Sequence, residues 1–323
     1  MGNLTVAVLG KQGYCNALGK KGTSTDITLY DLKNGKDTII FVEPTSYPER
    51  LAPLFYACSI AKKAIVVIDE LNSTLGEILV MLQCCEVSNG YFVLLNYISK
   101  DKIEPLVRGT LLENYKFVDD DQTALKELLL TKAAQTKSSE SINEKHPSGT
   151  VPVDHAFNVK GIGTVILGVV ANGVIQNHDT MNVLPGTKTT QIRSIQKHDH
   201  NFEFAIQGDR VGLALKNVKV DDVDRGRVLT NDTTIIASKM ITAHALLVNY
   251  WSTPLKTGMV LHLGHWMQFL NCKVEAVNDE KNWRRPILTL RLEKEIVHRH
   301  GDIAILMHLE GGKLRVTGTI ELP

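Results

Sequence analysis

The sequence predicts an α/β N-terminal domain followed by two small β-barrels. Two patterns favour this fold class: apolar runs alternate with helix-like stretches up to about Leu130, and short β-rich segments broken by glycine, asparagine and aspartate follow. The length agrees, because 323 residues are too many for one ordinary core. We expect the α/β domain and a C-terminal linker in residues 1–150, the first barrel in 151–234 and the second barrel in 235–323.

Four continuous apolar runs are expected to form parallel strands. Runs without polar alternation are typical of strands whose two faces are both covered. The runs cover residues 4–10, 38–42, 64–68 and 91–95. Between them, residues 50–57 and 75–82 have the apolar spacing of helices. Ligands of such open sheets bind beyond the carboxyl ends of the strands, so we expect a functional site where these four runs end.

The composition and the apolar pattern of the chain change after the α/β region. Residues 132–150 are polar, which predicts a linker or a fraying helix end. Beyond them, β-rich segments such as 163–170, 191–195 and 210–215 recur at the spacing of small barrels. The stretch is long enough for two barrels, and we expect their seam near Asn231.

The composition is that of a globular chain. Hydrophobic residues make up 43% and charged residues 22%, which excludes intrinsic disorder and a disulfide-dense scaffold. Lys and Arg number 36 against 35 Asp and Glu, so the net charge of +1 announces no polyanionic partner, although a local basic face is compatible with RNA. No apolar run approaches the ~18 residues of a membrane span. We therefore expect a cytoplasmic protein with no membrane partner.

Four motifs after the linker carry a resemblance to a known family. They are Pro152-Val-Asp-His-Ala-Phe-Asn-Val-Lys-Gly-Ile-Gly, Arg193-Ser-Ile-Gln, Gly208-Asp-Arg-Val-Gly and Arg225-Gly-Arg-Val-Leu. Together they resemble the second domain of EF-Tu/SelB-type translational GTPases, closest to archaeal SelB-like elongation factors and an EF-Pyl-like paralogue. The segments Gly22-Thr-Ser-Thr-Asp and Phe41-Val-Glu-Pro-Thr extend the resemblance to the N-terminal domain. The resemblance implies a P-loop-type α/β domain followed by the two barrels of the family.

The resemblance also implies an aminoacyl pocket in the first barrel. In the selenocysteine-specific factor the matching Asp, His and Arg line the pocket for the aminoacyl group, which gives that role to Asp154, His155 and Arg210. Lys160 and Arg193 complete the expected aminoacyl- and tRNA-binding set. The residues alone also allow a structural Asp154–Arg210 pair that closes a barrel turn. Asp154 and His155 are adjacent, so on a strand their side chains face opposite ways unless a bulge intervenes.

The first strand is followed by an altered P-loop. A working loop has the pattern G-x-x-x-x-G-K-[ST], whose backbone N–H groups surround the phosphates while lysine and a hydroxyl hold oxygens and Mg²⁺. Here the segment is Gly10-Lys-Gln-Gly-Tyr-Cys, without that spacing and without the Lys-Ser/Thr pair. As written it is not a working phosphate cradle, and Gly10, Lys11 and Gly13 are the contacts that it offers to GTP or GDP.

The other GTPase motifs are altered in the same direction. The D-x-P-G-H of the family, in which Asp holds a water of Mg²⁺ and His aligns the attacking water, corresponds to Glu43-Pro-Thr-Ser46-Tyr47. Glu43 and Ser46 are then candidate cofactor contacts, and Tyr47 is the candidate catalytic residue, although a phenol is a much poorer base than an imidazole. Ser24 stands at the Mg²⁺-binding threonine of the family. The guanine-reading N-K-x-D corresponds to Asn96-Tyr-Ile-Ser, which lacks the carboxylate.

The resemblance leads to one main functional hypothesis and two others. The main one is a monomeric SelB-like elongation factor that binds GTP, carries a specific aminoacyl-tRNA to the ribosome and hydrolyses GTP slowly, because no histidine aligns the water. The alternative is a degenerate GTPase that acts as a nucleotide-independent adaptor for tRNA or the ribosome. An initiation-factor-like carrier of initiator tRNA is the third.

Overall fold

A computed structural model describes residues 3–35, 37–135, 148–197, 200–279 and 282–323. The chain divides into two compact units. One unit contains the α/β domain together with two short segments, Leu247–Ser252 and Met307–Gly318, from residues 235–323, where the second barrel was expected. The other unit contains the first barrel and the remaining residues of the second barrel.

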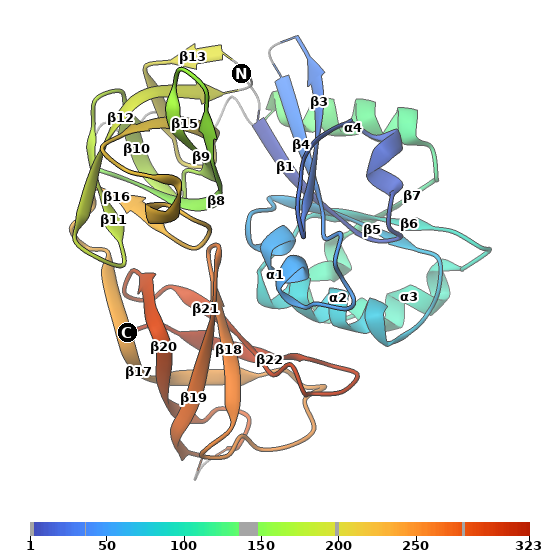
Figure 1. Cartoon of the computed structure of the whole chain (residues 1–323). Coiled ribbons are helices and arrows are strands. Elements are labelled where there is room, and N and C mark those ends of the chain that lie inside the picture. Colours follow the sequence, from blue (N-terminus) through green and yellow to red (C-terminus); the bar gives the residue numbers. More distant parts are fainter. Residues whose placement is uncertain (1–2, 36, 136–147, 198–199, 280–281) are drawn as a thin grey trace. The chain divides into compact units, whose positions relative to one another are not determined.

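The α/β domain is built on a seven-stranded sheet of order β2-β3-β4-β1-β5-β6-β7 (Figure 1). The strands are β1 Asn3–Gly10, β2 Lys20–Ser24, β3 Thr28–Asn34, β4 Asp37–Glu43, β5 Lys63–Ile68, β6 Gly90–Leu94 and β7 Lys116–Val118. β1 runs parallel to β4 and β5, and β5 runs parallel to β6, so the carboxyl ends of these four strands meet at one edge. This confirms the predicted open α/β sheet. The antiparallel pair β2 and β3 was not predicted.

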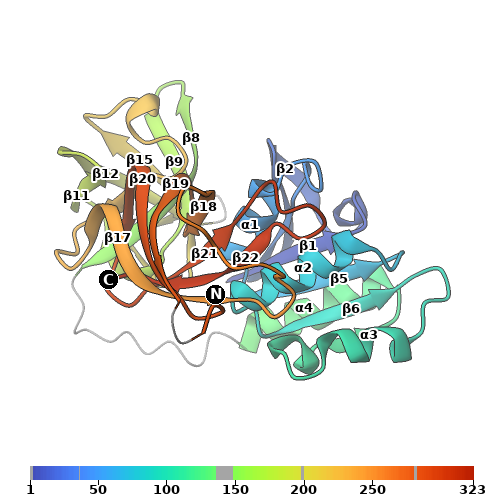
Figure 2. The ribbon, with the colours of Figure 1, turned by 90° about the horizontal axis from the view of Figure 1, so that it is seen from below.

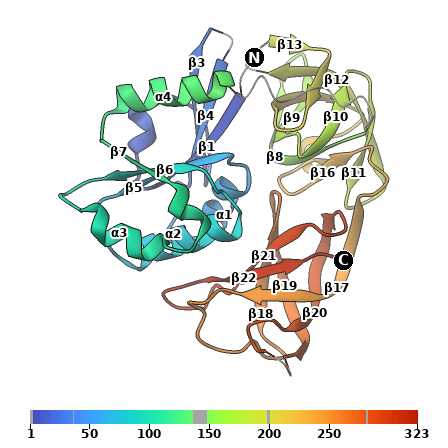
Figure 3. The ribbon, with the colours of Figure 1, turned by 180° about the vertical axis from the view of Figure 1, so that it is seen from behind.

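Helices cover both faces of this sheet. They are α1 Ala52–Ser59, α2 Ser73–Cys84, α3 Lys100–Val107 and α4 Gln122–Gln135, with short 3-10 turns η1 Tyr14–Ala17 and η2 Leu111–Asn114. Figure 3 shows α4 on one face of the sheet and the other three helices on the opposite face. The helix α2 begins where the side-chain oxygen of Asn72 accepts the N–H of Leu75 at 3.0 Å. Pro53 occupies the first turn of α1, where its missing N–H costs nothing.

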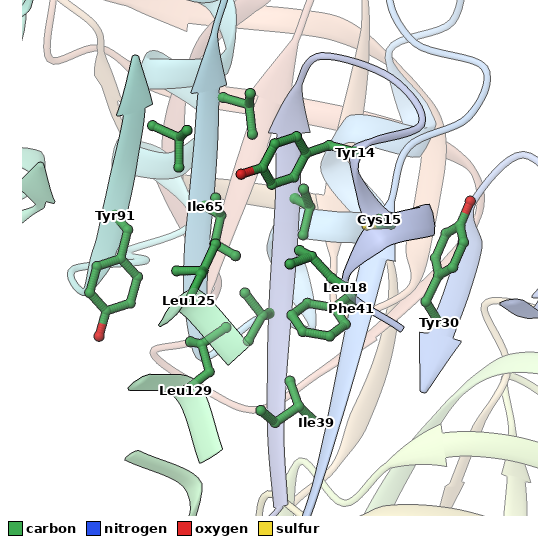
Figure 4. Packing of buried hydrophobic residues seen from close by; sticks show 14 of the residues in the cluster. Tyr14, Cys15, Leu18, Tyr30, Ile39, Phe41, Ile65, Tyr91, Leu125 and Leu129 are labelled. Atoms are coloured by element: carbon green, nitrogen blue, oxygen red, sulfur yellow. The ribbon is translucent and has the colours of Figure 1, made fainter. Parts of the chain in front are cut away.

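One face of the sheet packs against η1 and α4. Because strand side chains alternate, one set of residues from β1, β4, β5 and β6 points to this face. On α4, Leu125, Leu129 and Ala133 are four residues apart and form one buried stripe. Figure 4 shows the first two of these beside the strand residues Ile39 and Ile65. Burying each large apolar side chain contributes roughly 1.5–3 kcal/mol, so this core holds the carboxyl edge of the strands in place.

The first barrel closes because β8 pairs with both β16 and β9. Its ring runs β8-β16-β11-β12-β15-β9, and β10, β13 and β14 attach to it. The strands are β8 Gly149–Val159, β9 Gly163–Val169, β10 Asn172–Gln176, β11 Thr180–Leu184, β12 Lys188–Lys197, β13 His200–Phe202, β14 Phe204–Ile206, β15 Arg210–Lys216 and β16 Val228–Thr230. The three β-rich segments predicted here lie on β9, β12 and β15, and the predicted barrel is confirmed.

The second barrel is closed in the order β17-β20-β19-β18-β21-β22 (Figure 2). Its strands are β17 Ile236–Leu247, β18 Val260–His265, β19 Gln268–Asn278, β20 Ile287–His298, β21 Ile303–Met307 and β22 Val316–Glu321. A small apolar cluster of Val228, Ile235 and Val297, with Leu184 and Trp266 against it, joins the two barrels within their unit. The predicted pair of barrels is therefore present.

Two predictions about chain organisation are only partly covered by the structure. Residues 136–147 of the expected linker lie outside the described residues. The expected boundaries after residues 150 and 234 stay predictions. Among the described residues, no helix combines the length and apolarity that crossing a membrane requires.

Candidate functional site

A β-bulge in the first barrel brings Asp154 and His155 to the same side of β8. The register of β8 against β9 shifts between Val153 and His155, which inserts one extra residue. The Nδ1 atom of His155 consequently lies 2.8 Å from Oδ1 of Asp154. This is the bulge that the sequence required for the two adjacent side chains to act together.

Arg210, the first residue of β15, binds Asp154 in a bidentate pair. Its Nη1 donates to Asp154 Oδ2, and its Nη2 donates to Asp154 Oδ1 at 3.1 Å. Asp154 is 1% exposed and Arg210 is 7% exposed, so the pair is removed from water. Burial raises the pKa of Asp154, but the Arg210 guanidinium and the hydrogen bonds from His155 and Arg210 outweigh it and hold the pKa well below its usual range. The carboxyl is therefore ionised at neutral pH.

Arg225 completes the cluster, and sequence reasoning did not include it among the site residues. Its Nε donates to the main-chain oxygen of Asp154 at 2.8 Å, and its Nη2 lies 3.3 Å from Nε2 of His155. In the tautomer that carries its proton on Nδ1, His155 donates to Asp154 and its Nε2 accepts from Arg225. The signal was present in the quoted motif Arg225-Gly-Arg, but the contact joins positions 70 residues apart.

The segment that carries Arg225 rests against the second barrel. Gly226 has φ +91°, and a Cβ there would lie 3.5 Å from the carbonyl oxygen of Met267, in the turn between β18 and β19. Glycine is suited to this position because the backbone is left-handed and approaches another strand.

The cluster can bind an anion or a carbonyl group. Asp154 and Arg210 pair with each other, and the half-buried guanidinium of Arg225 lies beside the imidazole of His155. Guanidinium N–H groups favour carboxylates, phosphates and polarised carbonyl oxygens. The arrangement is chemically suited to an esterified amino acid or to the phosphates near it.

Lys160 and Arg193 lie apart from this cluster. They are exposed near the tip of the β8–β9 hairpin, where Nη1 of Arg193 donates to the main-chain oxygen of Ile162 at 3.2 Å. Five residues of extended strand separate Lys160 from His155, which amounts to roughly 16 Å. The five residues predicted from the sequence therefore form two groups, a buried polar cluster and an exposed basic tip.

At the P-loop position of the α/β domain, the chain turns sharply after β1. Gly10 has φ +95°, and a Cβ there would lie 2.1 Å from the carbonyl oxygen of Val67, so only glycine fits. The main-chain N–H of Lys11 donates to the same oxygen at 3.3 Å. The η1 turn that follows is four residues long. It is too short to supply the row of free N–H groups that the first turn of a long helix offers to phosphates.

Glu43 accepts the hydrogen bond that Gly13 could have given to a phosphate. The N–H of Gly13 donates to Glu43 Oε1 at 2.7 Å, and the hydroxyl of Tyr30 lies 3.2 Å from Oε2. Burial and the charge of Glu43 raise the pKa of Tyr30 to about 12, so its phenol stays protonated and donates. Both oxygens of the carboxylate expected at magnesium are thus used inside the protein.

The neighbouring polar groups are also joined to one another. The side-chain amide of Gln12 donates to the main-chain oxygens of Thr45, at 3.2 Å, and Tyr47, at 2.6 Å. The hydroxyl of Ser24 lies 2.9 Å from that of Thr28, which lies 2.6 Å from that of Thr45. The hydroxyl of Ser24, the predicted magnesium ligand, is therefore the first of three hydroxyl groups joined by hydrogen bonds.

The last three nucleotide-site candidates, Asn96, Tyr47 and Ser46, have internal partners as well. Asn96 follows β6 at the predicted edge, with φ +52°, and its side-chain amide donates to the main-chain oxygen of Asp69 at 3.0 Å. Tyr47 is only 5% exposed, and its hydroxyl points to Thr74 and Glu77 on α2. The N–H of Ser46 donates to the carbonyl of Asp26 at 3.2 Å.

These residues do not fit GTP with Mg²⁺, the groups that the resemblance implies. The N–H of Gly13 and the carboxylate of Glu43 satisfy each other, and no lysine is followed by Ser or Thr at the end of the loop. Within the described ranges, no three or more His, Cys, Asp or Glu side chains are grouped so as to hold a metal ion.

Comparison with known proteins agrees with this architecture. The family model of elongation factor Tu domain 2 matches residues 163–230. The chain is 35% identical over 323 residues to an uncharacterized protein of Methanocaldococcus jannaschii, and the alignment covers 100% of both chains. It is 28% identical over 178 residues to the selenocysteine-specific elongation factor of the same organism, covering 50% of this chain and 37% of that one.

A solved structure shares the fold over the whole chain. It is translation elongation factor SelB from Methanococcus maripaludis in complex with the GTP analogue GppNHp, with a TM-score of 0.82 and 21% sequence identity. The match covers 100% of this chain and 79% of that one. This likeness shows the fold. The domain-2 match and the elongation-factor relatives show that the chain belongs to the EF-Tu/SelB-type family of translational GTPases.

Proposed function

We propose that this protein binds the aminoacylated end of a transfer RNA during translation, and does so without a GTP switch. The observation that carries the proposal is a contrast within one chain. The Asp154, His155, Arg210 and Arg225 cluster is assembled, while the groups expected at GTP and Mg²⁺ bind one another. The proposal therefore joins the carrier role to the nucleotide-independent alternative.

The cluster supports recognition of a charged tRNA end because it is fixed before any ligand arrives. The bidentate Asp154–Arg210 pair and the bulge of β8 hold His155 in one orientation, and the guanidinium of Arg225 contacts both Asp154 and His155. Preorganised donors lose little entropy on binding, so they discriminate well between similar ligands. The difference that they would sense is the ester and amino group of the attached amino acid.

The exposed basic tip would contribute a different kind of contact. Lys160 and Arg193 are suited to phosphates of the tRNA backbone, which give affinity but no selectivity for the attached amino acid. A ribosome-bound step, a monomeric state and a cytoplasmic location belong to the same proposal, since the family acts in translation.

The test is a gel-shift titration with a pool of charged tRNAs and with the same pool after deacylation. We expect the charged pool to bind at least about 10-fold more tightly and its ester bond to be protected from hydrolysis, because one charge-assisted contact contributes about 1.5–3 kcal/mol. Sequencing the retained RNA identifies the species carried. Equal affinity for both pools, or no retention of either, rejects the proposal.

A further inference from the structure

Glu77 is a buried carboxylate that plays no part in the site described above. It lies on α2, among the apolar side chains of that helix, and is 3% exposed. An ionised carboxylate at such a position needs several donors to offset its loss of water. The structure supplies them from two distant parts of the sequence.

Arg315, which precedes β22, provides three of the donors. Its main-chain N–H donates to Glu77 Oε1 at 2.7 Å, its Nε donates to the same oxygen at 3.1 Å, and its Nη2 donates to Oε2 at 2.6 Å. The two residues belong to the same compact unit although 238 positions separate them. The main-chain bond fixes the path of the Met307–Gly318 segment as well as its side chain.

Tyr47 provides the fourth donor. Its hydroxyl lies 3.1 Å from Glu77 Oε2 and 3.1 Å from the main-chain oxygen of Thr74, and the Arg315 guanidinium is 5.8 Å from its ring. Burial, and then the charge of Glu77, raise the pKa of Tyr47 well above its usual range, so the phenol remains a donor. Gln12 binds the main-chain oxygen of Tyr47 at 2.6 Å from the other side.

These contacts run without interruption from the loop after β1 to the segment before β22. In a nucleotide-driven switch, the segment after β4 must be free to exchange partners when the nucleotide changes. Here that exchange would leave the buried carboxylate of Glu77 without its hydrogen-bond donors, which is strongly unfavourable. The energetic bias is toward one conformation.

We infer that Tyr47, Glu77 and Arg315 form a permanent clasp, which holds α2 and the segment after β4 to the Met307–Gly318 segment whatever nucleotide is present. The inference rests on these hydrogen bonds alone and does not depend on whether tRNA is bound. It assigns a structural purpose to the tyrosine that stands at the catalytic histidine position of the family.

Hydrogen exchange followed by mass spectrometry tests the clasp. In the wild-type protein, peptides covering α2 and residues 307–316 should exchange at the same rates without nucleotide and with millimolar Mg-GTP or Mg-GDP. In Arg315→Met both peptides should exchange about 30-fold faster, since the buried Glu77 loses the two side-chain donors of Arg315 and their positive charge. Helix α4, on the other face of the sheet, should be unchanged.

Matched variants separate the clasp from general damage. Lys313→Met removes the same charge from an exposed position in the same segment and should leave exchange at the wild-type rate. Tyr47→Phe removes only the hydroxyl and should accelerate α2 by a smaller factor. The double variant Glu77→Gln/Arg315→Met should exchange more slowly than Arg315→Met, because no charge is left unpaired. A nucleotide-dependent rate in the wild type, or an Arg315→Met protein with unchanged α2 exchange, overturns the inference.

Discussion

Replacing Asp154 with alanine is expected to lower the free energy of unfolding of the unit that contains the barrels by about 3–5 kcal/mol. The carboxylate pairs with Arg210 in a region almost closed to water, and its loss leaves the guanidinium buried without a counter-charge. It also removes the acceptor that orients His155. Urea unfolding followed by circular dichroism measures the loss.

The control for this change is Lys188→Ala. Lys188 pairs with Asp222 at the surface, with its own side chain 62% exposed, so removing it should cost less than about 1 kcal/mol. An Asp154→Ala protein within about 1 kcal/mol of the wild type would show that the buried pair is not a stabilising element. The difference from wild type should also depend on pH. Because the folded pKa of Asp154 is depressed, its contribution is complete above the unfolded value of about 3.9 and fades as the pH falls below it.

Arg225→Ala is expected to remove the preference for charged over uncharged tRNA, with a loss of about 10- to 100-fold in affinity for the charged form only. The physical reason is that Arg225 contacts both His155 and the main-chain oxygen of Asp154, while Arg210 is engaged by the Asp154 carboxylate. Titrating the variant with both pools gives the two dissociation constants directly.

Arg193→Ala is the matched control, because it removes the same type of side chain from the exposed hairpin tip. It should weaken binding of both pools equally and reduce the salt dependence by about one phosphate contact. If Arg225→Ala also weakened both pools equally, the cluster would not be sensing the attached amino acid.

The sheet of the α/β domain was readable because its central strands are continuous apolar runs. β1, β4, β5 and β6 lie where those runs predicted them. β2, the edge strand, and its neighbour β3 were missed because they carry polar residues such as Lys20 and Lys33, which leave no continuous apolar run. The antiparallel pair matters at the carboxyl end of β4, because Thr28 and Tyr30 of β3 contact Thr45 and Glu43 there.

For the candidate site, the sequence predicted which residues take part but not the contacts between them. The motifs pointed to Asp154, His155 and Arg210, and the adjacency of the first two required a bulge that the structure contains. No local pattern announces that Glu43 accepts from Gly13, since the two lie 30 residues apart and meet only when β1 and β4 pair. Such contacts depend on tertiary structure, so motif reasoning could report missing ligands but not what had replaced them.

The sequence does contain an indication that Glu77 is buried and paired, although it was not among the predicted site residues. Glu77 is the one carboxylate within the apolar stretch from Leu75 to Leu82, and a charge at such a helical position calls for a buried partner. The partner itself could not be inferred from the sequence, because Arg315 lies 238 positions away.

Affinity for charged tRNA, measured on nucleotide-free protein and again with saturating Mg-GTP or Mg-GDP, tests most directly whether this member of the family acts without a switch. Because the N–H of Gly13 is already engaged by Glu43 and not available to a phosphate, the three dissociation constants should agree within about 2-fold. A tightening of about 5-fold or more that appears with GTP and not with GDP would contradict the account, since that is the scale of coupling that a working switch produces.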